Sequence, residues 1–432
     1  MTAQADKRLF HARRLIFLFL ALAYFFVYFH RLSLSVVADE LTREFSASGS
    51  SLGLLGSVYF YCYALMQFPA GILSDAIGPR KIIASFLLIA SLGSILFGFA
   101  SSIEMAIAGR ILVGLGVSMV FVPSMKVFSQ WFESHEFASV AGALNAVGGV
   151  GVLGGTWLLA LMTGHFGWRL SFQVIGVCTL AISLLVWTMV RDRPDERQRA
   201  MIFKQDIKNK TDKKESPSIG LLGGARRTLS EKYFWPVAIW FFFDCGIFFG
   251  FGGLWSGPYL MDVHGMTRGE AGAALSMIAW GMILGSPFLG FLSDRIVKSR
   301  KKVIMACSLT LAAQFFLLFI SPSPLPHALL YVFFFFFSVC SSSIVVIGFT
   351  TAKELFPVEI AGASLGSVNL FPFLGGAVFM PVLGKVLDAW PKVGGAWPGD
   401  AWSTLIAILF GSSLAAVACA FFIKETFSPK AS

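Results

Sequence analysis

Residues 71–81 read GILSDAIGPRK, and residues 290–295 repeat the beginning of that stretch as GFLSDR. Each copy follows a long apolar run, and the glycine and the aspartate are displaced by the same number of positions along the chain. A second spacing also recurs, because Phe132 precedes Gly142 by as many residues as Phe356 precedes Gly366. The simplest account is a chain built from two homologous halves.

The composition indicates that most of the chain lies in lipid. Of the 432 residues, 56% are hydrophobic and only 13% are charged. Soluble domains average about 25% charged residues, so an ordinary soluble enzyme is excluded. All six cysteines lie in apolar runs without short paired spacing, and we therefore expect no metal site, no disulfide framework and no cofactor.

A helix needs about 20 apolar residues to cross a bilayer, and twelve segments meet that need. We expect spans at residues 15–38, 51–72, 82–101, 104–129, 138–162, 169–190, 233–257, 270–292, 303–321, 327–350, 361–386 and 401–423. The long polar stretch between the sixth and seventh spans is typical of a linker. The prediction is an all-α membrane protein: one six-helix bundle over residues 1–190, a linker over 191–232 and a pseudo-symmetric second bundle over 233–432.

The basic residues predict the orientation. The net charge is +10. With both termini and the linker in the cytoplasm, 26 of the 34 Lys and Arg residues fall on that side, and the external loops hold four. Cytoplasmic loops carry such an excess. We therefore expect a multi-pass plasma (inner) membrane protein with both termini cytoplasmic, whose basic excess reflects topology and contact with lipid rather than nucleic acid.

The loop motif resembles that of a known family. The hallmark G-x-L-[SA]-D-x-x-G-x-[RK]-[RK] of the major facilitator superfamily is matched by Gly71, Leu73, Ser74, Asp75, Gly78, Arg80 and Lys81. Gly109-Arg110-Ile-Leu-Val-Gly114 resembles a second motif of that family. The resemblance covers essentially the whole chain. It implies two six-helix bundles around a central cavity, with substrate moved by rocking between inward-open and outward-open states.

The first span also points to a branch of that family. Tyr28-Phe29-His30-Arg31 resembles the organic-anion and sugar-phosphate permeases, in which an arginine on the first helix meets the anionic group of the substrate. The fifth span is rich in glycine but lacks the proline of the drug/proton antiporter signature, which argues against a multidrug exporter. The eleventh span does contain Pro372-Phe-Leu-Gly-Gly376, so export stays open.

The loop motif predicts a conformational latch. Asp75 stands where a span ends and the chain turns through Gly78, so its carboxylate is expected to pair with Arg80 or to cap the neighbouring helix. A plain charged turn is the alternative. The candidate latch residues are Gly71, Asp75, Gly78, Arg80, Lys81 and Arg110, with Gly290 and Asp294 in the second copy.

Arg31 is the first candidate for substrate binding. Tyr24, Tyr28, Arg31 and Ser35 share one helix face, which should line the cavity. A guanidinium there can bind a carboxylate or phosphate bidentately. The alternative is an Arg31 side chain that extends to the outer headgroups.

Asp244 is the candidate for proton coupling. It lies near the middle of the seventh span, where an ionisable residue is costly and usually functional. Burial in an apolar site would favour its protonated form. Alternatively, it binds an ammonium group of the substrate or is a static partner of Arg31.

Other polar residues of the spans are weaker candidates. Tyr59 and Tyr63 share a face of the second span, where they contact substrate or simply pack between helices. Asn145 and Asn369 are substrate contacts or interhelical hydrogen bonds. Lys126 is an inner anion contact or extends to the cytoplasmic surface, whereas His30 and Glu40 are expected to be solvated near the outer end.

These features predict a proton-coupled secondary transporter that imports a small polar metabolite with an anionic group: an organic acid, a sugar phosphate or an amino acid. The alternatives are a proton-driven exporter of drugs or siderophore-like metabolites, and a sensor that no longer transports. No nucleotide-binding loop and no nucleophile–base constellation is present in the sequence, so we expect neither an enzyme nor an ATP-driven pump. The expected partners are the substrate, protons or another coupling ion, and lipid, with the protein a monomer.

Overall fold

The structure is a computed structural model that describes residues 2–196, 198, 202, 227–321, 324–356 and 361–427. Within these residues all regular structure is helical, apart from an isolated antiparallel bridge between Val393 and Ala396. Most of the expected linker lies outside the described residues. The fold is therefore described from the helices on either side of it.

The described residues as far as Met189 form eight α-helices and one π-helical turn. They are α1 (Thr2–Leu32), α2 (Leu34–Phe45), α3 (Gly49–Ile77), α4 (Pro79–Gly98), α5 (Ile103–Ser118), α6 (Phe121–Trp131), α7 (Ser134–Leu153), η1 (Gly154–Leu158) and α8 (Leu159–Met189).

The second half is also helical, with three π-helical segments. Its helices are α12 (Phe234–Ile247), η3 (Phe248–Trp255), α13 (Ser256–His264), α14 (Arg268–Phe291), η4 (Leu292–Ile296), α15 (Arg300–Ile320), α16 (His327–Ser338), η5 (Val339–Ser343), α17 (Val345–Glu354), α18 (Ala361–Asp388) and α19 (Gly399–Phe422).

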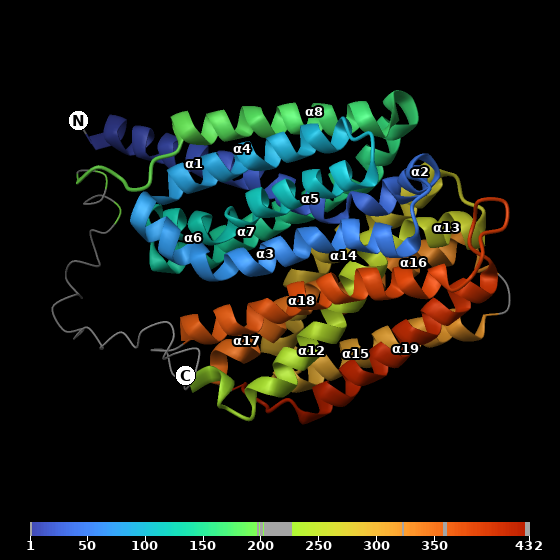
Figure 1. Ribbon diagram of the computed structural model, residues 1–432. Helices are drawn as coiled ribbons and strands as arrows, with labels where there is room; N and C mark the ends of the chain where they lie inside the picture. The colour runs from blue at the N-terminus through green and yellow to red at the C-terminus, as the bar shows by residue number, and fades with distance from the viewer. Residues whose placement is uncertain are drawn as a thin grey trace.

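The two sets of helices form two bundles side by side (Figure 1). In the first, α4 packs against α5 and α8, and α1 against α7; in the second, α12 packs against α18 and α19. The bundles meet where α3 runs along α18 and where α14 packs against α7. Both chain ends lie at one end of the molecule, here the terminus end, and α2 and α13 lie at the opposite, far end (Figure 1).

The helices are long enough to cross a bilayer. Ten described stretches are sufficiently long and apolar, and one of them, Ser139–Met189, has 51 residues. That stretch is interrupted at Gly167, whose φ of 74° and ψ of 161° are not helical, so it holds the expected fifth and sixth spans. The expected second span corresponds to α3, which is 29 residues long. All twelve expected spans are thus matched by helices.

The helices extend beyond the expected apolar segments. The first span was expected at residues 15–38, but α1 begins at Thr2, and α2 continues the path to Phe45 after a break at Ser33. Polar residues outside an apolar run still form helix where neighbouring helices cover them. Residues near the end of the predicted first span therefore lie well inside the bundle.

The outer surface of the bundles is apolar, as expected for helices in lipid. Leu65, Phe166 and Phe421 are all more than 60% exposed, and such large exposed apolar side chains would be a liability in water. Polar residues such as Arg110 and Asp244 are instead fully buried between helices. This arrangement is the inverse of a soluble protein and fits a multi-pass membrane protein.

The bundles interlock at the far end through glycines. A Cβ atom placed on Gly257 of α13 would lie 1.7 Å from the backbone oxygen of Ser35 on α2. Gly49 of α3 and Gly384 of α18 face each other in the same way, each within 2.4 Å of the other's carbonyl oxygen when given a Cβ. Small residues allow membrane helices to approach backbone to backbone, and here they close the seam between the halves.

We predict that Gly257→Ala separates the far ends of the two bundles. The added methyl group cannot fit against Ser35, and overpacking of this kind costs about 1–3 kcal/mol, enough to shift a conformational equilibrium roughly 5- to 150-fold. The distance between spin labels at Arg43 and Val393, in a cysteine-free background, should lengthen. The matched control is Gly411→Ala, where a Cβ meets nothing within 4 Å; an unchanged distance in Gly257→Ala would contradict the prediction.

Candidate functional site

Arg31 lies in a cage of aromatic rings at the seam between the two halves. Its guanidinium carbon is 4.5 Å from the ring centroid of Tyr28, 5.1 Å from Tyr63, 5.6 Å from Phe249 and 5.4 Å from Phe373. These four residues, the aromatic cage, come from α1, α3, η3 and α18. Arg31 is 5% exposed, so its side chain does not extend to the headgroups.

The cage stabilises the charge of Arg31 without using all of its hydrogen-bonding capacity. Aromatic faces attract a cation through their quadrupole, and Tyr63 stacks on Phe373 with ring centroids 4.2 Å apart. The Nε–H of Arg31 is nevertheless buried without a hydrogen-bond partner, and no described carboxylate forms an ion pair with this residue. A carboxylate or phosphate would supply the missing acceptors.

A second arginine supports the helix that carries Arg31. Arg110 of α5 is fully buried, donates from Nη1 to the backbone oxygen of His30 at 3.0 Å and lies 5.0 Å from the ring of Tyr59. The hydroxyl of Tyr59 donates to the backbone oxygen of Val27 at 3.1 Å. Both contacts tie α3 and α5 to α1, so Arg110 and Tyr59 position the arginine-bearing helix.

His30 was expected to be solvated, and that expectation is wrong. The side chain is fully buried, and neither ring nitrogen has a hydrogen-bond partner. The reason is that α2 continues the helical path of the first span to Phe45, so His30 is not at its outer end. His30 was named from the sequence, but the burial of its imidazole next to Arg31 was missed.

Asp244 lies inside the second half and not against Arg31. Both carboxylate oxygens are buried without a hydrogen-bond partner. The thiols of Cys340 on η5 and Cys307 on α15 are among its neighbours. The static pair of Asp244 with Arg31 that the sequence left open therefore does not form in this state.

The candidate amides lie near the cage. Asn369 of α18 donates from Nδ2 to Oε1 of Gln67 on α3 at 3.1 Å, across the seam between the halves. Gln67 is one helical turn beyond Tyr63, about 6 Å toward the terminus end. Asn145 is half-buried on α7, one turn before Gly148, where a Cβ would lie 2.8 Å from the ring of Tyr28.

Lys126 lies away from the cage, at the terminus end. Its ammonium contacts the carboxylate of Asp75 and donates to the backbone oxygen of Ser74 at 2.9 Å. The partner of Asp75 is thus Lys126 on α6 rather than Arg80, which corrects the pairing expected from the sequence. Arg80 lies beyond the turn at Gly78, whose φ is 98°, and its backbone N–H donates to Asp192 at 2.6 Å.

The other residues of the first loop copy are more open. Gly71 of α3 has nothing within 4 Å of a Cβ position, and Lys81 of α4 is exposed. Gly290 of α14, in the second copy, is equally open. These three residues make no contact that would define a latch by itself.

The second loop copy forms a denser charge cluster. Arg300 at the start of α15 contacts Asp294 and donates to Glu354 of α17 at 3.2 Å. Its backbone N–H donates to Glu425 at 3.0 Å. In place of the glycine turn of the first copy, Lys298 adopts a φ of 49°. Arg300 and Glu354 were not singled out by sequence because they lie far apart along the chain.

Two carboxylates join the halves at the far end. Glu40 of α2 forms an ion pair of 2.6 Å with Arg268 of α14. Asp388, at the end of α18, accepts hydrogen bonds from the backbone N–H groups of Gly49 and Ser50, the latter at 2.8 Å, and so caps α3 of the other half. Glu40 was expected to be solvated, but closure of the seam partly buries it.

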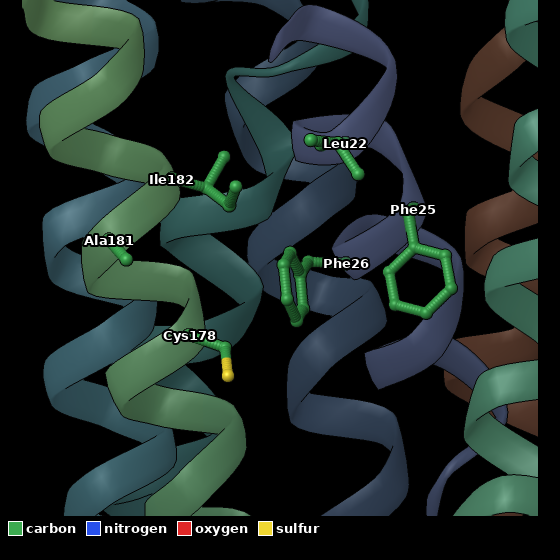
Figure 2. Close-up of a pocket in the computed structure, with 6 residues that line it drawn as sticks. All are labelled: Leu22, Phe25, Phe26, Cys178, Ala181 and Ile182. Atoms are coloured by element: carbon green, nitrogen blue, oxygen red, sulfur yellow. The ribbon is translucent and has the colours of Figure 1, made fainter. Parts of the chain in front are cut away.

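An apolar pocket lies between α1 and α8 (Figure 2), and none of the residues that line it belongs to the cage. It has a volume of about 310 Å³, and six residues line it: Leu22, Phe25 and Phe26 of α1 and Cys178, Ala181 and Ile182 of α8. Cys178 is exposed, so the pocket opens toward the outside of the bundle. It offers no charged or hydrogen-bonding group beyond a thiol and does not contribute to anion binding.

Comparison with known proteins identifies the family. The family model described as Major Facilitator Superfamily matches residues 20–256 and 237–432. The chain is 25% identical to "Membrane sensor protein UhpC" of Salmonella typhimurium, over 95% of this chain and 92% of that protein.

Two further relatives are named as transporters. "Probable hexose phosphate transport protein" of Chlamydia pneumoniae is 26% identical over 93% of this chain and 89% of its own, and "Probable galactarate/D-glucarate transporter GarP" of Escherichia coli is 23% identical over 90% and 91%. Among solved structures, a bacterial homologue of the human lysosomal transporter Spinster has a TM-score of 0.70, with 19% identity and 95% of both chains covered.

We predict that the far-end seam binds a proton through Glu40. Burial raises the pKa of the Glu40 carboxyl, Arg268 lowers it, and the nearby Asp39 and Glu44 raise it; the net pKa is above the usual value. A group whose pKa is higher in the sealed state than in water favours sealing when it is protonated. Spin labels at Arg43 and Val393 should therefore approach each other as the pH falls.

Glu40→Gln is neutral at every pH and should hold the seam closed a few-fold more often at neutral pH, with much of the pH dependence lost. The matched control is Glu104→Gln at the start of α5, within one half. A seam that opens in Glu40→Gln would instead mean that the ion pair with Arg268 outweighs the burial of the carboxylate.

Proposed function

Because the chain belongs to the major facilitator superfamily, we propose that it is a proton-coupled transporter that imports a small polar metabolite bearing an anionic group. An organic acid, a sugar phosphate or an amino acid would fit. The observation that carries this proposal is the buried Arg31 in its aromatic cage, which lacks a carboxylate partner in the described chain. The relatives named for hexose phosphate and for galactarate and D-glucarate carry anionic substrates, which supports the same class.

In this proposal the anion binds the guanidinium of Arg31, which contacts aromatic rings of both halves. Tyr28 and Tyr63 belong to the first half, whereas Phe249 and Phe373 belong to the second. An anion bound to Arg31 adds hydrogen bonds that the rings cannot make. It thereby changes the contacts between Arg31 and the rings, which hold the halves together. A ligand shifts a conformational equilibrium only through such differential contacts, so a site shared by both halves suits alternating access.

Polar groups around the cage would form hydrogen bonds with the rest of the substrate. Asn145 lies on the first half, one helical turn before Gly148, which packs against the ring of Tyr28, and Asn369 lies on the second half. The bond between Asn369 and Gln67 offers an amide donor and acceptor that substrate hydroxyls could replace. Tyr59 has its hydroxyl engaged by Val27, and its proposed part is to position α1; Lys126 is engaged by Asp75 and is assigned to the latch rather than to the substrate.

We place the terminus end in the cytoplasm and the far end outside the inner membrane. The excess of Lys and Arg in the loops of the terminus end supports this orientation. The far end is closed by Gly257, Glu40 and Asp388, so the state described is inward-facing. The proposed latch is formed at the terminus end by Asp75 with Lys126 and by Asp294 with Arg300. Next to the first of these pairs, the backbone N–H of Arg80 donates to Asp192.

Asp244 is proposed as the proton carrier. Its carboxylate is fully buried in the middle of the second half without a hydrogen-bond partner. A carboxylate in such a place is costly while ionised, and loading a proton removes that cost. The two thiols beside it are poor substitutes for a cation, so the charge state of Asp244 should depend on access to water during the transport cycle.

A second candidate is a sensor that binds its anion without moving it. The relative named as a membrane sensor protein is 25% identical to this chain over 95% of its length, which favours this alternative. The same Arg31 site would then detect the ligand. Uptake of the bound anion into proteoliposomes separates the two: binding without uptake under every imposed gradient would favour the sensor.

We predict that Arg31→Lys weakens anion binding. Lysine keeps the positive charge but cannot form a bidentate contact, and hydrogen bonds to charged groups are worth about 1.5–3 kcal/mol, so affinity should fall roughly 10- to 100-fold. Calorimetry with D-glucarate, hexose phosphates, monocarboxylates and amino acids measures the effect. Arg43→Lys, at an exposed far-end position, is the matched control; undiminished affinity of Arg31→Lys for the tightest ligand would exclude Arg31 as the anion site.

We predict that Asp244→Asn uncouples transport from protons. An amide cannot load or release a proton, so accumulation driven by a pH gradient in proteoliposomes should fall more than tenfold. Exchange of labelled for unlabelled substrate needs no net proton movement and should persist. Asp400→Asn at the exposed start of α19 is the control, and gradient-driven accumulation by Asp244→Asn at the wild-type level would remove Asp244 from the coupling mechanism.

A further inference from the structure

Two lysines from distant parts of the chain contact one tyrosine at the terminus end. The Nζ atom of Lys232 lies 5.0 Å from the ring centroid of Tyr233, and that of Lys424 lies 4.7 Å from the same centroid. Tyr233 immediately precedes α12, and Lys424 follows the end of α19. The two ammonium groups are therefore no farther apart than the sum of these distances.

No acidic side chain balances these charges in the part of the chain that the structure describes. Neither ammonium has a carboxylate within ion-pair distance, although Glu231 and Glu425 are adjacent in sequence. Glu231 accepts from the backbone N–H of Tyr233 at 3.4 Å. Glu425 accepts from the side chain of Ser299 and from the backbone N–H groups of Arg300 at 3.0 Å and Phe427 at 2.9 Å.

The carboxylate of Glu425 is committed to those donors. Burial acts against its ionised form, but the hydrogen bonds from Ser299, Phe427 and Arg300 outweigh it and hold the pKa of Glu425 below its usual value. The group is therefore a charged acceptor already satisfied by its own segment. Lys232 and Lys424 are therefore exposed cations without a carboxylate partner among the described residues, and both contact the ring of Tyr233.

Exposed aromatic residues flank this cluster in the sequence, as expected where the membrane meets water. Trp235 in the first turn of α12 is 42% exposed, and Phe421 and Phe422 in the last turn of α19 are 64% and 68% exposed. The indole N–H of Trp235 donates to the backbone oxygen of Leu229 at 3.0 Å. Tryptophan with its ring in lipid and its N–H at a polar group is typical of the interface.

We propose that Lys232, Lys424 and Tyr233 form a binding site for the headgroup of an anionic phospholipid in the leaflet at the terminus end. The phosphodiester would accept hydrogen bonds from both ammonium groups. Its acyl chains would lie along the exposed rings of Trp235, Phe421 and Phe422. A third lysine, Lys301, lies 5.3 Å from the ring of Phe421 and adds to the local positive charge.

The exposed apolar residues favour a lipid rather than a free anion as the ligand of this site. A soluble phosphate would gain only the charge contacts, which salt screens at an exposed site, whereas a lipid also covers the rings beside them. Binding would clamp the segment after α19 against the start of α12. That segment holds Arg300 through Glu425 and through Phe427, whose ring centroid is 5.3 Å from the guanidinium, so the lipid would stabilise the whole terminus end of the second half.

The test compares lipids that differ only in headgroup charge. Delipidated full-length protein in neutral detergent is titrated with phosphatidylglycerol or with phosphatidylcholine of the same acyl chains, and the melting temperature is recorded. We expect phosphatidylglycerol to raise the melting temperature and phosphatidylcholine to raise it much less. Lys232→Gln/Lys424→Gln should weaken the phosphatidylglycerol effect roughly tenfold or more in concentration, while Lys302→Gln/Lys353→Gln removes equal charge at the same end and should not.

Three outcomes would overturn the proposal. One is equal stabilisation of the wild type and Lys232→Gln/Lys424→Gln by phosphatidylglycerol, and another is equal stabilisation of the wild type by the two lipids. The third is stabilisation by inorganic phosphate or glycerol 3-phosphate as strong as that by the lipid, which would make this a site for soluble anions. If Lys232→Gln/Lys424→Gln fails to fold, native mass spectrometry of the wild type in a mixture of both lipids decides, since retention without preference for phosphatidylglycerol also contradicts a headgroup site.

Discussion

The cation–π cage around Arg31 is the contact on which the proposed transport function of this protein depends. A charged side chain at the centre of a membrane helix costs about 2.5–3.5 kcal/mol on insertion scales, and Arg31 cannot lower that cost by losing its proton. Rings from four helices, two from each half, surround the guanidinium instead. The cage fixes where α1, α3, η3 and α18 must meet, and an anion that competes with the rings acts on both halves together.

Much of this arrangement could be predicted from the sequence. The repeated loop motif and the apolar runs give two six-helix bundles, because lipid leaves the backbone few alternatives to helix. Helical spacing also placed Tyr28 on the same face as Arg31. Phe249 and Phe373 could not be selected, because 45 phenylalanines satisfy the same apolar pattern and only tertiary packing decides which two reach the guanidinium.

Charge pairing was harder to predict than helix position. Sequence proximity favoured Arg80 as the partner of Asp75, but Lys126 from α6 takes that place, and the guanidinium of Arg80 lies instead 5.8 Å from the ring centroid of Trp187. His30 was misjudged for a related reason: the helical path continues past the apolar run. In both cases local composition was informative about the residue's chemistry, whereas its neighbours were set by helices distant in sequence.

The seam between the halves has two chemically different parts, and the proposed coupling would use both. At the far end, closure buries Glu40 beside Arg268, so sealing and proton uptake are linked, and linkage is reciprocal: whatever favours the seal also favours the proton. At the cage, an anion acts through Arg31 on rings from both halves. A bound anion that draws the halves together would therefore raise the proton affinity of Glu40 without touching it, and the proposed symport would have a route through the seam in addition to the one proposed through Asp244.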